Sequence, residues 1–225
     1  MPRKIRTYES DELIVEYDAK RCIHAAECVH GLPSVFDPES RPWISPQQGD
    51  SADLMQVIER CPTGALQYRR KDEQPGEVAP ETNSVRVSAG GPVYLRGDLR
   101  ITLPDGEVLR ETRAALCRCG QSGDKPFCDN SHIEAGFDEP GGIAENRLVV
   151  SETAGEGPLE ITLAANGPVL IRGPVGVTGT DGQTVEGVSG ALCRCGHSAS
   201  KPFCDGRFPH TRITHIKRII LGTTT

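Results

Sequence analysis

Three cysteines and one histidine lie close together near the middle of the chain, and these residue types are common metal ligands. Cys117 and Cys119 are two residues apart, so on an extended segment, where side chains alternate between faces, both thiols point to one side. Cys128 and His132 are four residues apart, which places them one turn apart on one helical face if Asp129 caps a helix that starts there. The segment therefore offers two pairs of metal ligands.

Two ligand pairs, each able to fill half of a tetrahedron, suit a centre of two metal atoms better than a single ion. A [2Fe–2S] cluster is such a centre, and mixtures of cysteine and histidine ligands occur in clusters of this kind. A structural zinc ion is the alternative, although zinc ligand pairs typically have the wider spacing C-x₂₋₄-C. A disulfide framework fits less well, because the chain has 9 cysteines, an odd number, and is not a short secreted domain.

The same pattern occurs a second time further along the chain. A constant offset of 76 residues separates Cys117 from Cys193 and Cys128 from Cys204, and the match continues upstream without a gap. Other pairs with this offset are Cys119 and Cys195, Gly91 and Gly167, Arg96 and Arg172, and Asp105 and Asp181. A whole small domain has therefore been duplicated within the chain.

Both copies resemble the CDGSH iron–sulfur domain of the mitoNEET type, whose pattern is C-x-C-x₂-S/T-x₃-P-x-C-D-G-S/A/T-H. The first copy departs from it only at Asn130, where the family has glycine. The resemblance implies a [2Fe–2S] cluster with the two close cysteines on one iron and the third cysteine and the histidine on the other. It also implies that strands of two modules interleave, as they do in family dimers. The residues that match are Cys117, Cys119, Ser122, Pro126, Cys128, Asp129, Ser131 and His132.

The second copy departs from the pattern at its fourth ligand. Phe208 stands four residues after Cys204, and His210 stands six residues after it, which on an ideal helix is a different face. A short insertion that delays the helix would restore His210 as the ligand, and we expect this arrangement. His197, His215 or an incomplete second cluster are the alternatives.

Residues 1–70 form a different unit with its own candidate ligands. Bacterial ferredoxins hold a cubane cluster through C-x₂-C-x₂-C and a distant Cys-Pro. Here Cys22 and Cys28 flank Ala25, which cannot bind a metal, and Cys61 precedes a proline. The unit resembles the divergent single-cluster ferredoxin domain.

Similar proteins that lack the middle cysteine often hold a [3Fe–4S] cluster, whose three irons need only three thiolates. The resemblance therefore implies such a cluster at Cys22, Cys28 and Cys61. A [4Fe–4S] cluster completed by another ligand, such as His24 or His30, is the alternative. A scaffold that has lost its cluster and keeps its cysteines as buried residues is a further one.

The hydrophobic pattern predicts the framework of this N-terminal unit. Residues 13–17 and 65–68 are expected strands, and residues 52–60 are an expected helix with Ser51 as its N-cap. Trp43 is expected in the core or as a lid over the site. The buried stripe of the helix comprises Leu54, Val57 and Ile58.

An acidic, proline-bearing linker is expected over residues 71–83, before CDGSH modules at 84–147 and 148–225. The predicted fold class is α+β, with a small ferredoxin-like N-terminal domain followed by two mostly-β CDGSH modules packed as an intramolecular pseudo-dimer in a monomeric protein. The expected strands of the modules include 84–87, 93–95, 148–150 and 213–221, with turns at 104–107 and 180–183.

Composition excludes several classes of function. The net charge of −6 argues against a nucleic-acid binder, whose surface is usually basic. No apolar run is long enough to span a membrane, and the first residues lack the features of a secretory signal. Nucleotide-binding and catalytic-triad motifs are absent, so we expect a protein that is not an enzyme. Cytoplasmic thiols stay reduced and free for metal, which favours that location.

These observations predict an iron–sulfur protein that transfers single electrons to or from a redox partner protein. Replacing a thiolate by a neutral histidine makes a cluster easier to reduce. Four basic residues near the cysteines could offset its charge further, or could be solvated surface charges: Arg118, Lys125, Arg194 and Lys201. A protein that stores clusters and passes them to an apo-acceptor is the alternative function, and a structural zinc module is a third.

Overall fold

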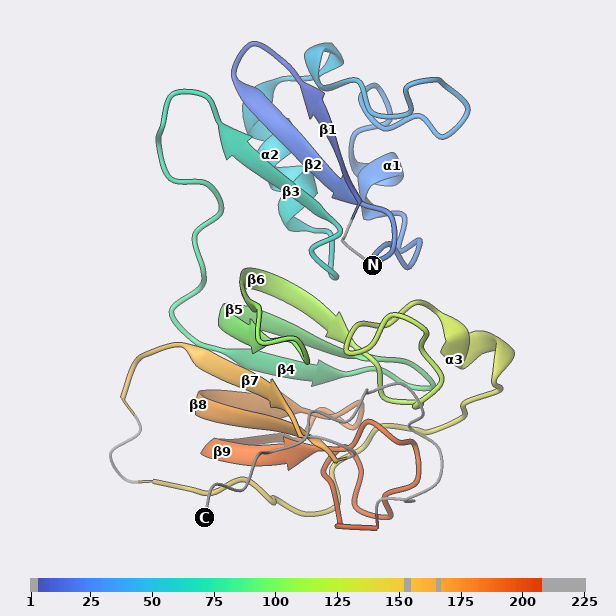
Figure 1. The fold of residues 1–225 in the computed structure, drawn as a ribbon, viewed down its shortest axis with the longest axis vertical. Coiled ribbons are helices and arrows are strands. Elements are labelled where there is room, and N and C mark those ends of the chain that lie inside the picture. The colour runs from blue at the N-terminus through green and yellow to red at the C-terminus, as the bar shows by residue number, and fades with distance from the viewer. Residues whose placement is uncertain (1–3, 152–154, 165–166, 208–225) are drawn as a thin grey trace, which may run out of the picture.

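The computed structural model describes residues 4–151, 155–164 and 167–207. Two bodies stand one above the other in Figure 1, an N-terminal unit of strands and helices and a larger body of strands. Residues 71–83 connect them and contain no helix or strand. None of the helices described is long and apolar enough to cross a membrane.

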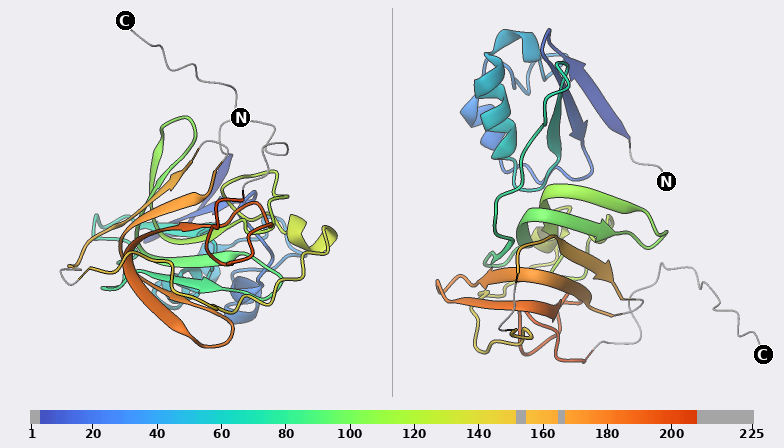
Figure 2. Two further views of the ribbon diagram at one scale, coloured as in Figure 1. Left: turned by 90° about the horizontal axis from the view of Figure 1, so that it is seen from below. Right: turned by 90° about the vertical axis from the view of Figure 1, so that its left-hand side faces the viewer.

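The N-terminal unit is a 3-stranded antiparallel sheet in the order β1-β2-β3, with its helices on one face (Figure 2). Side chains of β2 and α2 pack in its core, where Leu13, Val15, Leu54 and Ile58 are buried. The elements are β1 (Ile5–Glu9), β2 (Leu13–Asp18), α1 (Glu27–Gly31), η1 (Pro46–Gln48), α2 (Ser51–Glu59) and β3 (Leu66–Arg70).

The predicted strands of this unit are present as β2 and β3, but β1 was not expected. The predicted helix is α2, and its expected stripe of Leu54, Val57 and Ile58 is buried. Its predicted N-cap was wrong. Asp50, one residue before Ser51, is the cap, because its carboxylate accepts bonds from the backbone N–H groups of Ala52 and Asp53 at 2.8 and 3.3 Å.

The larger body contains a 6-stranded sheet to which both repeats contribute. Its elements are β4 (Ser84–Val87), β5 (Val93–Thr102), β6 (Val108–Leu116), α3 (Ser131–Glu134), β7 (Leu159–Leu163), β8 (Val169–Thr178) and β9 (Thr184–Leu192). The bounds of β8 and β9 are those of β5 and β6 moved along by the same 76 residues that separate Cys117 from Cys193. The duplication seen in the sequence is therefore also a duplication of structure.

Each repeat pairs its first strand with strands of both repeats. β4 pairs antiparallel with the first part of β5, and it also pairs parallel with β8, where Ser84 faces Gly176. β7 likewise pairs antiparallel with β8 and parallel with β5, where Leu159 faces Leu99. The register of β5 and of β8 shifts midway along the strand. The two repeats are thus joined by backbone hydrogen bonds in both directions.

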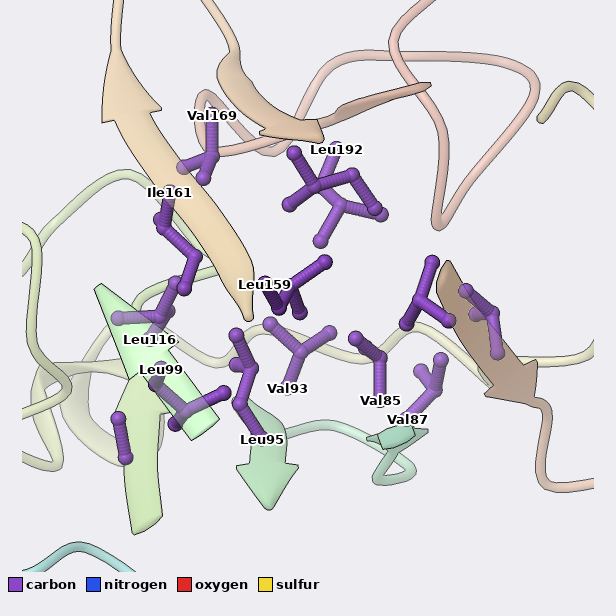
Figure 3. Close-up of a cluster of buried hydrophobic side chains, with 14 of the residues drawn as sticks. Val85, Val87, Val93, Leu95, Leu99, Leu116, Leu159, Ile161, Val169 and Leu192 are labelled. Atoms are coloured by element: carbon purple, nitrogen blue, oxygen red, sulfur yellow. The ribbon is translucent and has the colours of Figure 1, made fainter. Parts of the chain in front are cut away.

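One hydrophobic core serves both repeats. Leu99 and Leu116 of the first repeat pack with Leu159 and Leu192 of the second, and the exposed fraction of each is 1% or less. Figure 3 shows these side chains converging from strands of the two copies. Units of this size bury little surface alone, so sharing a core compensates for their small size.

Several details of the predicted modules differ from the structure. The strand expected at 93–95 continues to Thr102, and the strand expected at 148–150 is only an isolated bridge between Val149 and Ser189. Both predicted turns are present, with Gly106 and Gly182 donating backbone bonds back to Leu103 and Gly179. The strand predicted over 213–221 lies outside the described residues.

Candidate metal sites

The first candidate site is a closed loop at the end of β6. Cys117 directly follows the strand, and its N–H donates to Pro126 O at 2.8 Å. The N–H of Cys128 donates to Ala115 O at 2.9 Å, so the returning chain is tied to the same strand. Cys117, Cys119 and Cys128 are all buried, and the β6 ladder therefore fixes the positions of three thiols.

The four predicted ligands of this loop are brought together as two pairs. The Sγ atoms of Cys117 and Cys119 are 3.7 Å apart, and Cys128 Sγ lies 3.4 Å from Nδ1 of His132. Two thiolates on one tetrahedral metal atom, each bound at about 2.3 Å, lie about 3.8 Å apart. Each pair therefore has the spacing of two ligands of one metal atom.

A short helix presents His132, although its cap is not the predicted one. Helix α3 begins at Ser131, and Asn130, with φ 71°, occupies the N-cap position instead of Asp129. The Asp129 carboxylate accepts bonds from Ser131 N at 3.0 Å and Gly123 N at 2.7 Å. Burial works to raise the pKa of Asp129, but these bonds hold it below its ordinary value. Asp129 therefore ties the loop to the helix.

The protonation of these groups follows from burial and mutual contact. Burial raises the pKa of Cys128 to about 11. The hydrogen bond between Cys117 and Cys119, followed by burial, raises the pKa of Cys117, and the same bond lowers that of Cys119 to about 6. Burial also lowers the pKa of His132, which favours the neutral imidazole that binds metal. Loading the site with metal must release thiol protons.

The second candidate site repeats this construction for three of its ligands. The Sγ atoms of Cys193 and Cys195 are 3.7 Å apart, and Cys204 N donates to Ala191 O at 2.8 Å. The side chain of His197 is exposed. The predicted ligand His210 lies outside the described residues, as do Phe208 and His215.

The two loops pack against each other through their backbones. Gly120 has φ 82°, and a Cβ placed on it would lie 2.9 Å from Cys195 O. Gly196 has φ 80°, and a Cβ there would lie 2.8 Å from Cys119 O. Both positions therefore need glycine, for conformation and for space. The two cysteine-bearing turns are in direct contact.

The basic residues singled out in the sequence bind backbone carbonyl groups. Arg118 has an exposed fraction of 1% and donates to Gly91 O, Ser88 O and Glu139 O at 2.9, 2.7 and 3.1 Å. Arg194 is also buried and donates to Gly167 O and Ala164 O at 2.6 and 2.8 Å.

The two arginines are thus not solvated surface charges. Burial lowers the pKa of Arg118, although Glu139 and the nearby Cys193 and Cys119 act to raise it. A cation therefore lies close to cysteines of both loops.

The two lysines lie at the rim of their loops. Lys125 Nζ donates to Ser122 O at 2.5 Å, and Lys201 Nζ donates to Ser198 O at 2.7 Å. Lys201 also pairs with Glu139 of the first repeat at 3.2 Å. Both lysines therefore hold the loop backbone, and whether they tune a cluster stays a prediction.

The third candidate site is a cavity of about 630 Å³ in the N-terminal unit. Cys22, Cys28 and Cys61 all line it. Burial raises the pKa of Cys28 to about 11, and the nearby thiols of Cys61 and Cys22 act in the same direction. The structure therefore gathers the three predicted cysteines around one space.

Three aromatic residues, Tyr8, Tyr17 and Trp43, contribute to the wall of this cavity. Trp43 lines it and packs edge-on against Tyr17, with ring centroids 5.0 Å apart. Trp43 is partly buried against the core of the unit and also forms part of the cavity wall. His24 lines the cavity, whereas the exposed His30 is not among its lining residues. Over the described ranges, no group of three or more His, Cys, Asp or Glu residues is arranged to hold a single metal ion.

Sequence reasoning missed three charged residues that lie between the N-terminal unit and the first repeat. Arg21 and Arg113 each have a side-chain exposed fraction of 2%, and Glu111 has 6%. Arg21 Nη1 donates to Glu111 Oε1 at 2.6 Å across the boundary. A signal did exist, because the second copy has Gly187 and Ser189 in place of Glu111 and Arg113.

Comparison with known proteins finds matches to both parts of the chain. A family model described as a divergent 4Fe-4S mono-cluster matches residues 8–71, and one described as an iron-binding zinc finger of CDGSH type matches residues 90–133 and 166–207. Two Escherichia coli proteins, from strain K12 and from O157:H7, are each named uncharacterized protein YjdI. Each is 38% identical over 66 residues, covering 29% of this chain and 87% of its own length.

Proposed function

The chain belongs to the iron-binding CDGSH proteins, with a divergent 4Fe–4S mono-cluster domain before its two CDGSH motifs, and we propose that it is a single-electron carrier. In this proposal each CDGSH loop holds a [2Fe–2S] cluster, and the N-terminal domain holds a third cluster. The protein is not an enzyme. It exchanges electrons with a redox partner protein in the cytoplasm.

The observation that carries the proposal is the pairing of ligands in the first loop. Cys117 and Cys119 form one pair at 3.7 Å, and Cys128 and His132 form the other at 3.4 Å. Two separate pairs suit two bridged irons, one held by each pair. A [2Fe–2S] centre supplies one-electron redox chemistry, and a histidine ligand raises its potential.

The chain's own residues position the ligands of this centre through hydrogen bonds. Arg118 fixes the loop through three backbone carbonyls, and Asp129 fixes the segment that leads to His132. A buried, pre-formed site changes little when its charge changes, which suits repeated electron transfer. The same arrangement at Cys193, Cys195 and Cys204 supports a second cluster, with His210 as the proposed fourth ligand.

In the N-terminal domain we propose a [3Fe–4S] cluster held by Cys22, Cys28 and Cys61. Three cysteines around one cavity match the three thiolates that such a cluster needs. A [4Fe–4S] cluster is the second candidate, because the matching family is a 4Fe-4S one and His24 also lines the cavity.

We also propose that the two CDGSH modules act as an intramolecular pseudo-dimer, in a monomeric protein with a ferredoxin-like N-terminal domain. The reciprocal pairings of β4 with β8 and of β7 with β5 support this proposal.

The test is a count of iron and acid-labile sulfide per chain after anaerobic purification, read with electron paramagnetic resonance before and after dithionite. An oxidised [3Fe–4S] signal and two reduced [2Fe–2S] spins per chain are the expected result. A single [2Fe–2S] spin would mean that the second loop lacks its cluster. Zinc in place of iron would overturn the proposal.

Cluster transfer to an apo-acceptor is the second candidate function. It is favoured by the exposure of His132, which is only partly buried although the three cysteines of its loop are buried. A partly exposed ligand that can take up a proton is a natural point of release. The reduced protein should be incubated with an apo-ferredoxin: an electron carrier keeps its iron through repeated redox cycles, whereas a cluster donor loses it.

A further inference from the structure

The cysteine-bearing end of the N-terminal domain touches the metal loop of the first repeat. Asn130 Nδ2 donates to Ile23 O at 2.8 Å. Ile23 directly follows Cys22, and Asn130 lies between Cys128 and His132. One hydrogen bond therefore joins a segment that bears a ligand of one site to a segment that bears ligands of the other.

A second contact runs beside the first. Arg21, on the other side of Cys22, lies over the ring of Phe127 with its Cζ 4.5 Å from the ring centroid. Phe127 directly precedes Cys128. The residues that flank Cys22 on both sides thus contact residues that flank Cys128.

One buried ion pair and several hydrogen bonds to backbone carbonyls hold this junction together. Arg21 donates to Glu111 at 2.6 Å, to Arg113 O at 3.1 Å and to Thr63 O. In the other direction, Arg113 donates to Cys61 O at 2.5 Å and to two further carbonyls of the N-terminal domain. Breaking buried charge pairs leaves an uncompensated charge, so the contact is a fixed junction and not a loose encounter.

The second repeat lacks the side chains that make this junction. The residues that correspond to Glu111, Arg113 and Asn130 are Gly187, Ser189 and Gly206. The second repeat instead touches the first, where Gly120 meets Cys195 and Gly196 meets Cys119. The three candidate sites therefore form a series with the first repeat in the middle.

We propose that the first CDGSH site is the obligatory middle station of an electron relay, and that Asn130 is a positioning residue that couples it to the N-terminal site. The proposal rests on the proposed function. One electron leaves the site at one end as the first repeat accepts it, and the first repeat then passes it to the site at the other end. No proton or covalent bond is transferred within the chain, and a redox partner protein supplies or removes the electron.

The order of the relay is tested on the full chain by removing one cluster at a time. A pulse of reductant delivers less than one electron per chain, and freeze-quenched electron paramagnetic resonance then follows which cluster holds it. C204A removes a proposed ligand of the second loop, and in this variant electron exchange between the N-terminal site and the first repeat should persist. C128A removes a proposed ligand of the first loop, and in this variant first-order electron exchange between the N-terminal site and the second repeat should be lost. Exchange that continues in C128A at a rate independent of protein concentration would overturn the relay.

Because removing a ligand also weakens the fold, a milder variant tests Asn130 itself. N130G gives the first repeat the residue that stands at position 206, and glycine accepts the φ of 71°. It should slow exchange with the N-terminal site and reduce the spin–spin broadening between the two clusters. G206N is the matched control: it adds the same side chain to the second repeat, where a Cβ has none of the described residues within 4 Å, and should change neither quantity.

The outcomes separate this proposal from the proposed function. Unchanged exchange and broadening in N130G, with full iron content, would remove Asn130 from the relay and leave the carrier function standing. If the wild-type protein loses iron when reduced, the carrier function itself fails. In that case the relay, which rests on the carrier function, fails with it.

Discussion

Gly120 of the first repeat faces the carbonyl oxygen of Cys195 in the second, so closely that a Cβ at Gly120 would lie 2.9 Å from that oxygen. Gly196 has the reciprocal relation to Cys119. The contact joins two metal loops that lie 76 residues apart in the sequence, as Gly120 and Gly196 do. It makes the geometry of each loop depend on the other.

The first prediction concerns this contact. G120A should destabilise the iron-loaded protein by about 1 to 3 kcal/mol, because alanine is strained at φ 82° and its Cβ also meets a backbone oxygen. Guanidinium unfolding followed by cluster absorbance measures the loss. G106A is the matched control, since Gly106 has φ 91° but, in the described part of the chain, nothing lies within 4 Å of an added Cβ. Equal losses in the two variants would show that the close approach is unimportant.

The second prediction concerns the buried pair between the domains. E111A removes the carboxylate that Arg21 contacts at 2.6 Å and leaves the arginine buried without it. We expect a loss of about 3 kcal/mol in unfolding free energy. The control is E16A, which removes the partner of the exposed Arg69 and should cost less than about 1 kcal/mol. Similar small effects in both variants, measured by urea unfolding, would contradict a tight junction.

The third prediction concerns the imidazole ligand. H132C should keep the cluster but lower its midpoint potential, because a fourth thiolate adds negative charge. A redox titration followed by visible absorbance measures the shift. H30A is the control, since His30 is exposed and does not line the N-terminal cavity. An unchanged potential in H132C would argue against His132 as a ligand.

The fourth prediction is a dependence on pH. Burial lowers the pKa of His132 below 6.5, so the unfolded chain takes up this proton at a higher pH than the folded one. The stability contributed by neutral His132 is therefore present above about pH 6.5 and is lost as the pH falls through that value. Iron bound to the imidazole would strengthen the effect, because metal and proton compete for the same nitrogen.

Cluster loss should accordingly accelerate between about pH 7 and pH 5, as the pH falls through the ordinary histidine pKa. The decay of visible absorbance measures it in rapid pH-jump experiments. H132C should show a weaker dependence over the same range at the first site. An equally steep profile in H132C would assign the acid sensitivity to another group.

The fifth prediction identifies the fourth ligand of the second loop. H210A should reduce the content of [2Fe–2S] spins from two to one per chain, whereas H197A should leave it at two, because His197 is exposed. Iron analysis and electron paramagnetic resonance of both variants decide the matter. Loss of a cluster in H197A alone would make His197 the ligand.

The sequence was sufficient to find the candidate ligands of the first loop. The spacing of Cys117 from Cys119 and of Cys128 from His132 reflects local geometry, and local geometry follows from alternation along a strand and from one helical turn. The same reasoning found α2 and its buried stripe, since helical periodicity is also local. The same reasoning did not identify the N-cap of α2. Asp50 and Ser51 are both good capping residues, and only the backbone conformation decides between them.

The junction between the domains could not be predicted in the same way. Arg21 and Arg113 resemble ordinary surface charges in the sequence, and their burial depends on the packing of segments far apart in the chain. The pairing of β4 with β8 is similarly non-local, since the residues on these strands show only that they are strands. Comparison of the two copies was the one indication, because the second copy has Gly187, Ser189 and Gly206 where the first has Glu111, Arg113 and Asn130.

The shared core of the two repeats has a consequence for how the protein can be specialised. In a symmetric dimer of identical modules, any substitution appears twice, so both halves acquire the same surface. Fusing two modules into one chain around a common core lets each half change independently while the pair stays together. Here one half carries the charged residues and the asparagine that contact another domain, whereas the other half has glycine at two of these three positions. The duplicated chain thus combines a symmetric architecture with two halves whose surfaces differ.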